Sequence, residues 1–151
     1  MKRLVLLSLL LLFGAASTAR ARLGETPDQI VARFGNGGPL AIIQNGPLKD
    51  LRQQNFQKQG FDIQVIFTDI SVGETYTAGG KLTEDQVQAL LAANNEGHPW
   101  KEFQWNGNRY WDRDDGAKAQ LINNQFAFKS KLLVDKEERW KQAQLPDVNG
   151  F

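Results

Sequence analysis

One side chain in the sequence is suited to proton transfer near neutral pH, the single histidine His98. A catalytic triad would need His98 as its base. The sequence contains no G-x-S-x-G motif, and His98 lies in a predicted loop of Asn, Glu, Gly and Pro residues. We therefore expect His98 to have a structural role, such as capping the last carbonyls of the preceding helix. One histidine and no cysteine also argue against a zinc site, and no motif implies a cofactor.

Acidic residues suggest two further kinds of chemistry. The segment from Asp112 to Gly116 begins like a calcium-binding loop, but Gln and Asn residues stand where that loop needs its closing glutamate. We predict a hairpin turn there instead. A pair of carboxylates for hydrolysis could come from Glu74, Glu102 or Asp112, although their spacing selects no pair. A hydrolase of envelope glycans or peptides that uses such carboxylates is the alternative function.

Aromatic side chains concentrate between Trp100 and Trp111, a segment with three of the four tryptophans. Asn106 and Gly107 lie in the middle of this segment. Asn-Gly supplies the two positive-φ residues of a type I′ turn, so the segment is predicted to form a β-hairpin. Closing the hairpin with these two residues places Phe103 opposite Tyr110.

The two faces of this hairpin should carry different aromatic side chains. Phe103, Trp105 and Tyr110 share one face, and Trp111 points to the other. One face must pack on a helix, whereas the other can show aromatic rings to water, as protein-binding hot spots and sugar platforms do. The alternative is that both faces are covered. The predicted binding contacts are Trp105, Arg109, Tyr110 and Trp111.

The elements around the hairpin can be predicted from caps and periodicity. Capping boxes begin two helices, at Thr26 with Gln29 and at Thr83 with Gln86. Glycines in the left-handed conformation should end these helices, Gly35 the first and Gly97 the second.

Period-two patterns and turn residues predict strands after each helix. The predicted strands are Phe61–Thr68, Val72–Thr77, the two arms of the aromatic hairpin, Ala117–Ile122 and Gln125–Lys129, and a closing helix is predicted over Val134–Gln142. Tight turns between strands indicate antiparallel pairing, because parallel strands need long crossovers. The predicted fold class is therefore α+β with an antiparallel sheet and a C-terminal helix.

Two matches within the chain, at nearly the same spacing, indicate an internal duplication. Thr26–Phe34 aligns with Thr83–Leu91, and Gly60–Ile66 aligns with Gly116–Ile122. The predicted organisation is two tandem helix-plus-antiparallel-sheet repeats, residues 22–80 and 81–145. The second repeat includes the C-terminal helix, and residues 146–151 form a tail.

Residues 1–21 have the parts of a secretory signal peptide. Two basic residues precede an apolar run from Leu4 to Phe13, and an Ala-x-Ala site predicts cleavage after Ala21. The apolar run is shorter than the ~20 residues that span a membrane. The protein is thus expected to be exported, periplasmic or extracellular, and not inserted in the membrane after cleavage. With no cysteine, it forms no disulfide and carries no lipid on a cysteine.

The charge argues against a nucleic-acid partner. The chain has 18 basic and 17 acidic side chains. Three of the basic ones, Lys2, Arg3 and Arg20, lie in the predicted signal, so the exported chain has a slight acidic excess. No basic run predicts binding to nucleic acid or to an anionic membrane.

The repeated helix start T-x-D-Q-[IV]-x-A-x-[FL], followed by a glycine and a strand meander, resembles the family of bacterial β-lactamase inhibitor proteins. One repeat is also similar to the small lipoprotein of the outer-membrane barrel-assembly machinery. The resemblance implies a tandem helix-and-sheet fold that binds another protein on a sheet surface. The chain lacks the cysteines of the inhibitors and the lipid-bearing cysteine of the lipoprotein. The start of the predicted exported chain, at Arg22, resembles small exported bacterial proteins of unknown function.

Together these observations predict a non-catalytic, exported binding module of the cell envelope. Its partner would be another exported protein or a peptide, held on a sheet face by the aromatic hairpin. The motivating observations are the repeated layout, the hairpin and the lack of a recognisable nucleophile motif.

Overall fold

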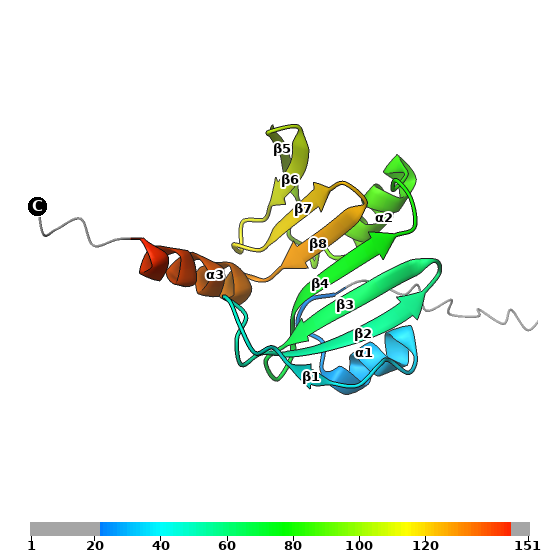
Figure 1. Ribbon diagram of the computed structural model, residues 1–151. Coiled ribbons are helices and arrows are strands. Elements are labelled where there is room, and N and C mark those ends of the chain that lie inside the picture. Colours follow the sequence, from blue (N-terminus) through cyan, green and yellow to red (C-terminus); the bar gives the residue numbers. More distant parts are fainter. Residues whose placement is uncertain (1–21, 146–151) are drawn as a thin grey trace, which may run out of the picture.

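The computed structural model describes residues 22–145, which form three helices and one eight-stranded sheet (Figure 1). The predicted signal peptide, residues 1–21, and the predicted tail, residues 146–151, lie outside the described residues. In chain order the elements are α1 (Pro27–Phe34), β1 (Ala41–Ile42), β2 (Arg52–Lys58), β3 (Phe61–Phe67), β4 (Ser71–Ala78), α2 (Glu84–Ala93), β5 (Lys101–Trp105), β6 (Asn108–Asp112), β7 (Lys118–Ile122), β8 (Gln125–Lys129) and α3 (Lys131–Gln144).

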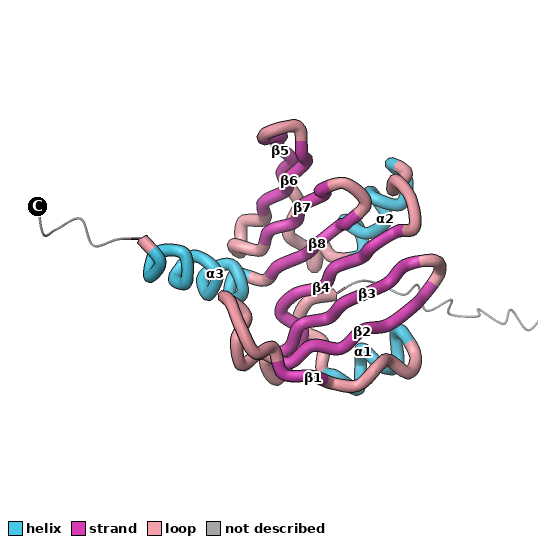
Figure 2. Tube along the Cα trace, in the orientation of Figure 1, coloured by secondary structure: helices cyan, strands magenta, loops and turns pink. Residues whose placement is uncertain are grey.

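All neighbouring strands of the sheet are antiparallel, in the order β1-β2-β3-β4-β8-β7-β6-β5 (Figure 2). Strands β4 and β8 lie at the centre, and β1 and β5 form the two edges. This arrangement confirms the predicted α+β class, its antiparallel sheet and its C-terminal helix. No helix within residues 22–145 is long and apolar enough to cross a membrane.

Both predicted capping boxes are present, at Thr26 for α1 and at Thr83 for α2. The helix ends differ from the prediction. Gly35 ends α1 as predicted and has a positive φ of 89°, but its ψ of −168° differs from that of the left-handed helical conformation. Gly97 does not end α2, because the helix stops at Ala93 with Asn94 as its cap. The carbonyl of Asn94 accepts a hydrogen bond at 2.6 Å from the Arg113 guanidinium in the β6–β7 turn. If the helix continued, this carbonyl would accept from a backbone N–H of the next turn instead.

Two strands were not predicted, β1 and β2. Strand β2 is mostly Arg, Gln, Asn and Lys, and only Phe56 in it is buried, so it lacks the alternation that marks a strand. Helix α3 begins before the predicted Val134, because Ser130 caps it and accepts a hydrogen bond from the backbone N–H of Leu133. The predicted β7 and β8 are confirmed, with β7 starting one residue later than expected.

Helices α1 and α2 pack on the same face of the sheet, which we call the helix face. Buried side chains of both helices join inward-facing strand residues in one apolar cluster, which includes Ile30, Phe34, Ile63, Val65, Phe67, Tyr76, Val87, Leu91, Trp111, Phe126 and Phe128. This burial is the main source of stability in a chain without disulfides.

Helix α3 packs by its first turn on the opposite face, which we call the open face. Its Leu133 is 1% exposed and lies in a second apolar cluster with Ile66. A Cβ atom on Gly73 would lie 2.7 Å from Leu133 Cδ2, so only glycine leaves room for this contact. Beyond this turn, α3 extends away from the sheet (Figure 1).

The two halves of the chain correspond at the positions that the internal matches indicated. Thr26 and Thr83 cap equivalent helices. Gly60 and Gly116 lie in equivalent turns, β2–β3 and β6–β7, with φ of 81° and 85°. Such correspondence agrees with two tandem repeats, and the duplication stays a prediction.

Candidate binding surface

The aromatic hairpin has the predicted turn and register. Asn106 and Gly107 adopt φ of 50° and 75°, as a type I′ turn requires. Trp105 lies opposite Asn108, and the pairing continues to Lys101 opposite Asp112. The turn residues thus set which side chains share a face.

The open face of the hairpin carries three aromatic rings, Phe103, Trp105 and Tyr110, which we call the aromatic face. The rings of Phe103 and Tyr110 stack with centroids 5.5 Å apart and planes inclined by 19°. The ring of Trp105 lies 6.3 Å from that of Tyr110. Phe103 is 45% exposed and Trp105 is 63% exposed, so much of this apolar surface meets water.

Trp111 points to the helix face, and its placement corrects its assignment as a binding contact. It is 2% exposed, and its ring centroid lies 5.2 Å from that of Phe126. The alternation of a strand places neighbours on opposite faces, so Tyr110 and Trp111 could not both be surface contacts on one face. Trp111 belongs to the core under α2.

Arg109 also lies on the helix face, where it connects α2 to the hairpin. Its guanidinium is 2.7 Å from Glu84 of α2 and 2.7 Å from Glu102 of β5, and it lies 4.9 Å from the ring centroid of Trp111. Hydrogen bonds from Arg109 lower the pKa of Glu84 to about 2 and also lower the pKa of Glu102. With both carboxylates bound, Arg109 is placed as a structural link and not on the aromatic face.

A groove of about 280 Å³ separates the aromatic face from α3. Apolar and charged side chains of both walls line it, among them Phe103, Trp105, Tyr110, Lys118, Lys129, Val134, Glu137, Glu138 and Lys141. Lys129 is paired with Glu137 at 2.8 Å across its base. The sequence indicated the aromatic wall, whereas the contribution of α3 was missed, because nothing in the pattern of α3 tells where it docks.

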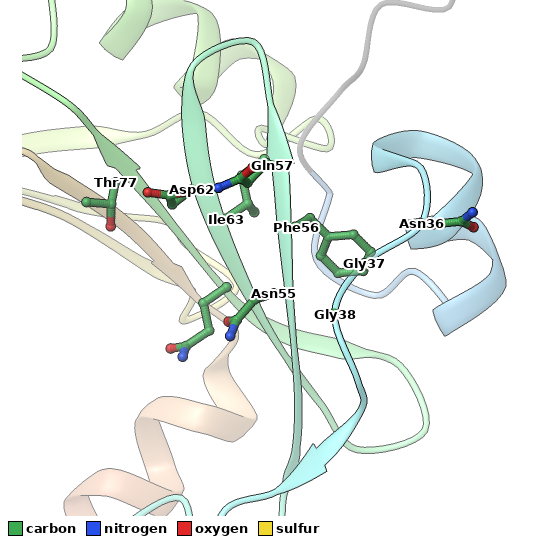
Figure 3. A pocket seen from close by; sticks show the side chains of 10 residues that line it. Asn36, Gly37, Gly38, Asn55, Phe56, Gln57, Asp62, Ile63 and Thr77 are labelled. Atoms are coloured by element: carbon green, nitrogen blue, oxygen red, sulfur yellow. Dashed lines mark hydrogen bonds between the residues drawn. The ribbon is translucent and has the colours of Figure 1, made fainter.

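The open face also has a shallow polar depression of about 830 Å³ near the other edge, shown in Figure 3. Its wall includes Asn55, Gln57, Asp62 and Thr77, and Gln57 Nε2 donates to Asp62 Oδ1 at 2.9 Å. These side chains offer hydrogen-bond donors and acceptors, and Asp62 supplies the one carboxylate among the lining residues. Sequence reasoning missed the depression because exposed Asn, Gln and Thr are typical of any solvated strand face.

The three carboxylates proposed for hydrolysis are not brought together. Glu74 is buried between β4 and α1, Glu102 binds Arg109, and Asp112 pairs with a lysine of β7 at 3.2 Å. Glu102 and Asp112 also project from opposite faces of the hairpin, because Asp112 alternates with Trp111, the cross-strand partner of Glu102. This placement does not favour the hydrolase.

His98 does not cap the carbonyls of α2. Its Nδ1 lies 2.6 Å from Asp114 Oδ1 in the β6–β7 turn. Two carbonyls at this end of α2 accept from other side chains: Trp100 Nε1 donates to Leu91 O at 3.1 Å, and Arg113 donates to the carbonyl of the cap residue Asn94. The turn predicted in this acidic segment is present after the end of β6, and in it Arg113 is held by Asp115 at 2.5 Å.

A buried cluster of charged side chains lies between α1 and β4, and sequence reasoning did not predict it. Arg33 of α1 lies 2.5 Å from Glu74 and 2.8 Å from Glu25, and the Tyr76 hydroxyl donates to Glu74 at 2.6 Å. Burial raises the pKa of Glu74 and of the less completely buried Glu25, and the Arg33 guanidinium between them, which lowers both pKa values, offsets this only in part. Among residues 22–145, Arg33 Nε finds no hydrogen-bond partner.

This cluster predicts a pH dependence of stability above the ordinary glutamate pKa. A carboxyl whose pKa is raised by folding binds more protons in the folded than in the unfolded chain, so stability falls as pH rises from about 4.5 through the raised pKa. Urea unfolding at a series of pH values should show this slope in the parent and a smaller one in Glu74→Gln. Equal slopes in the two proteins would show that the cluster titrates normally.

No protein family matches this chain, and neither a curated protein nor a solved structure matches it significantly. The resemblance to β-lactamase inhibitor proteins and to the barrel-assembly lipoprotein therefore stays a prediction. Support for a function therefore comes from the exposure and contacts of the described residues.

Proposed function

We propose that this chain is an exported, non-catalytic binding module of the cell envelope that holds a protein or peptide in the groove between the aromatic face and α3. The observation that carries the proposal is the exposure of Phe103 and Trp105 beside that groove. Exposed aromatic rings that border a concavity are the usual anchors of protein recognition. Trp111 and Arg109 take no part, since the core and the α2 link hold them.

The walls of the groove fit a peptide better than a small polar molecule. Phe103 and Tyr110 are already stacked, so they offer a rigid apolar surface that loses little conformational freedom on binding. The facing wall offers both charges, through Glu138 and Lys141 of α3. A peptide can place apolar side chains on the rings and pair its own charges with the helix.

Selection of displayed random peptides on the purified protein tests this proposal. Peptides selected on the parent should bind Phe103→Ala or Trp105→Ala at least about thirtyfold more weakly, because truncating an aromatic hot spot costs about 2 kcal/mol or more. Isothermal titration calorimetry gives the dissociation constants.

Trp140→Ala is the matched control. Trp140 is 42% exposed on α3 but does not line the groove, so its removal should leave the affinity unchanged. Peptides that bind all three variants as well as the parent would reject the aromatic face as the binding surface.

A further inference from the structure

The two edges of the sheet differ in how much of a strand they offer. Strand β1 has two residues, whereas β5 has five, all of them exposed. No element within residues 22–145 pairs with the outer side of β5. The β5–β6 hairpin also projects beyond the rest of the sheet (Figure 1). An edge strand of this kind is a template for pairing with another strand.

The register of the hairpin determines which backbone groups of β5 face outward. In a hairpin closed by a two-residue loop, the flanking residues form a hydrogen-bonded pair, here Trp105 with Asn108. Hydrogen-bonded and non-hydrogen-bonded pairs then alternate. The backbone N–H and C=O groups of Phe103 thus bond to β6, and those of Glu102 and Gln104 point away from the sheet.

We propose that β5 pairs in antiparallel fashion with β5 of a second copy of this chain, about a twofold axis at Phe103. In this register Glu102 of each copy lies opposite Gln104 of the other. These are the two β5 residues with free outward backbone groups, so each such pair exchanges two backbone hydrogen bonds. The axis passes through a non-hydrogen-bonded Phe103 pair, where side chains approach most closely.

The side chains of β5 are complementary to themselves in this register. The Gln104 amide can donate to the Glu102 carboxylate of the second copy, since Glu102 is kept ionised by Arg109. Lys101 lies opposite Trp105 of the second copy, where an ammonium can rest on the indole ring. No position places like charges opposite one another. These self-complementary pairs favour a second copy over an unrelated extended peptide.

The dimer does not depend on the proposed function, but it would change the surface on which that function relies. Residues paired across antiparallel strands lie on the same face of a sheet. The aromatic faces of the two copies would therefore lie on one side of a continuous sheet and adjoin at Phe103.

Sedimentation equilibrium of the purified protein tests the dimer. A short edge buries little area and associates weakly, so the measurement covers about 10 μM to about 1 mM protein. Gln104→Lys should tighten dimerisation at least about threefold, because the new positive charge lies directly opposite Glu102 of the other copy, and this pair occurs twice per dimer. Gln104→Glu should weaken it by a similar factor, and high salt should reduce both effects.

Gln104→Pro removes an outward N–H without touching the bonds to β6, and it should weaken dimerisation about tenfold or more. Hydrogen exchange adds a readout without mutation: the amides of Glu102 and Gln104 should become protected as concentration rises. Circular dichroism shows whether each variant is folded. A parent that is monomeric throughout the range, or a dimer that is unaffected in folded variants of all three kinds, overturns the proposal.

Discussion

Arg33→Met should destabilise the fold by about 3–5 kcal/mol, the cost of leaving a buried charge without its partner. Glu74 is 1% exposed and has Arg33 as its only cationic contact within the described chain. The Tyr76 hydroxyl can supply one hydrogen bond, but no positive charge. Urea unfolding followed by circular dichroism measures the loss.

The double variant Arg33→Met/Glu74→Leu separates loss of the pair from loss of packing. Removing both charges should recover much of the stability, because buried ion pairs replaced by apolar residues are often neutral in cost. Arg139→Met, at an exposed position of α3, should change the unfolding free energy by less than about 0.5 kcal/mol. An Arg33→Met variant as stable as Arg139→Met would contradict the role given to the buried cluster.

Trp111→Ala should cost about 3–5 kcal/mol, as truncation of a large buried aromatic side chain does. The indole is 2% exposed, packs on Phe126 and supports the guanidinium of Arg109. Its removal therefore leaves a cavity under α2 and frees the link between α2 and the hairpin.

Trp105→Ala is the matched control for this substitution, since it removes the same ring from the same hairpin. Trp105 is 63% exposed, so its truncation should cost less than about 1 kcal/mol. Equal midpoints of urea unfolding for the two variants would contradict the assignment of Trp111 to the core and Trp105 to the surface.

The hairpin could be predicted closely because its information is local. Asn106 and Gly107 determine the turn, and the turn determines the register of every pair up to Asp112. The same local rules located both helix starts. What the hairpin sequence does not contain is which of its two faces meets a helix, so Trp111 and Trp105 were equally plausible as contacts.

The rest of the site depends on contacts between residues far apart in the chain. Helix α3 borders the groove because Leu133 fits over Gly73, and neither residue signals the other in the sequence. The pairing of Arg33 with Glu74 likewise joins α1 to β4. Strand β2 was missed because it gains its order from pairing with β3 and not from its own apolar pattern.

The strand order also has a consequence for how the molecule folds. Six of the seven strand pairings join strands that follow one another in the chain, and only β4 with β8 unites the two halves. Pairing of consecutive strands closes short loops and is fast, whereas the pairing of β4 with β8 closes a long loop and is slower. The slow step of folding should therefore be the docking of two preformed meanders along β4 and β8.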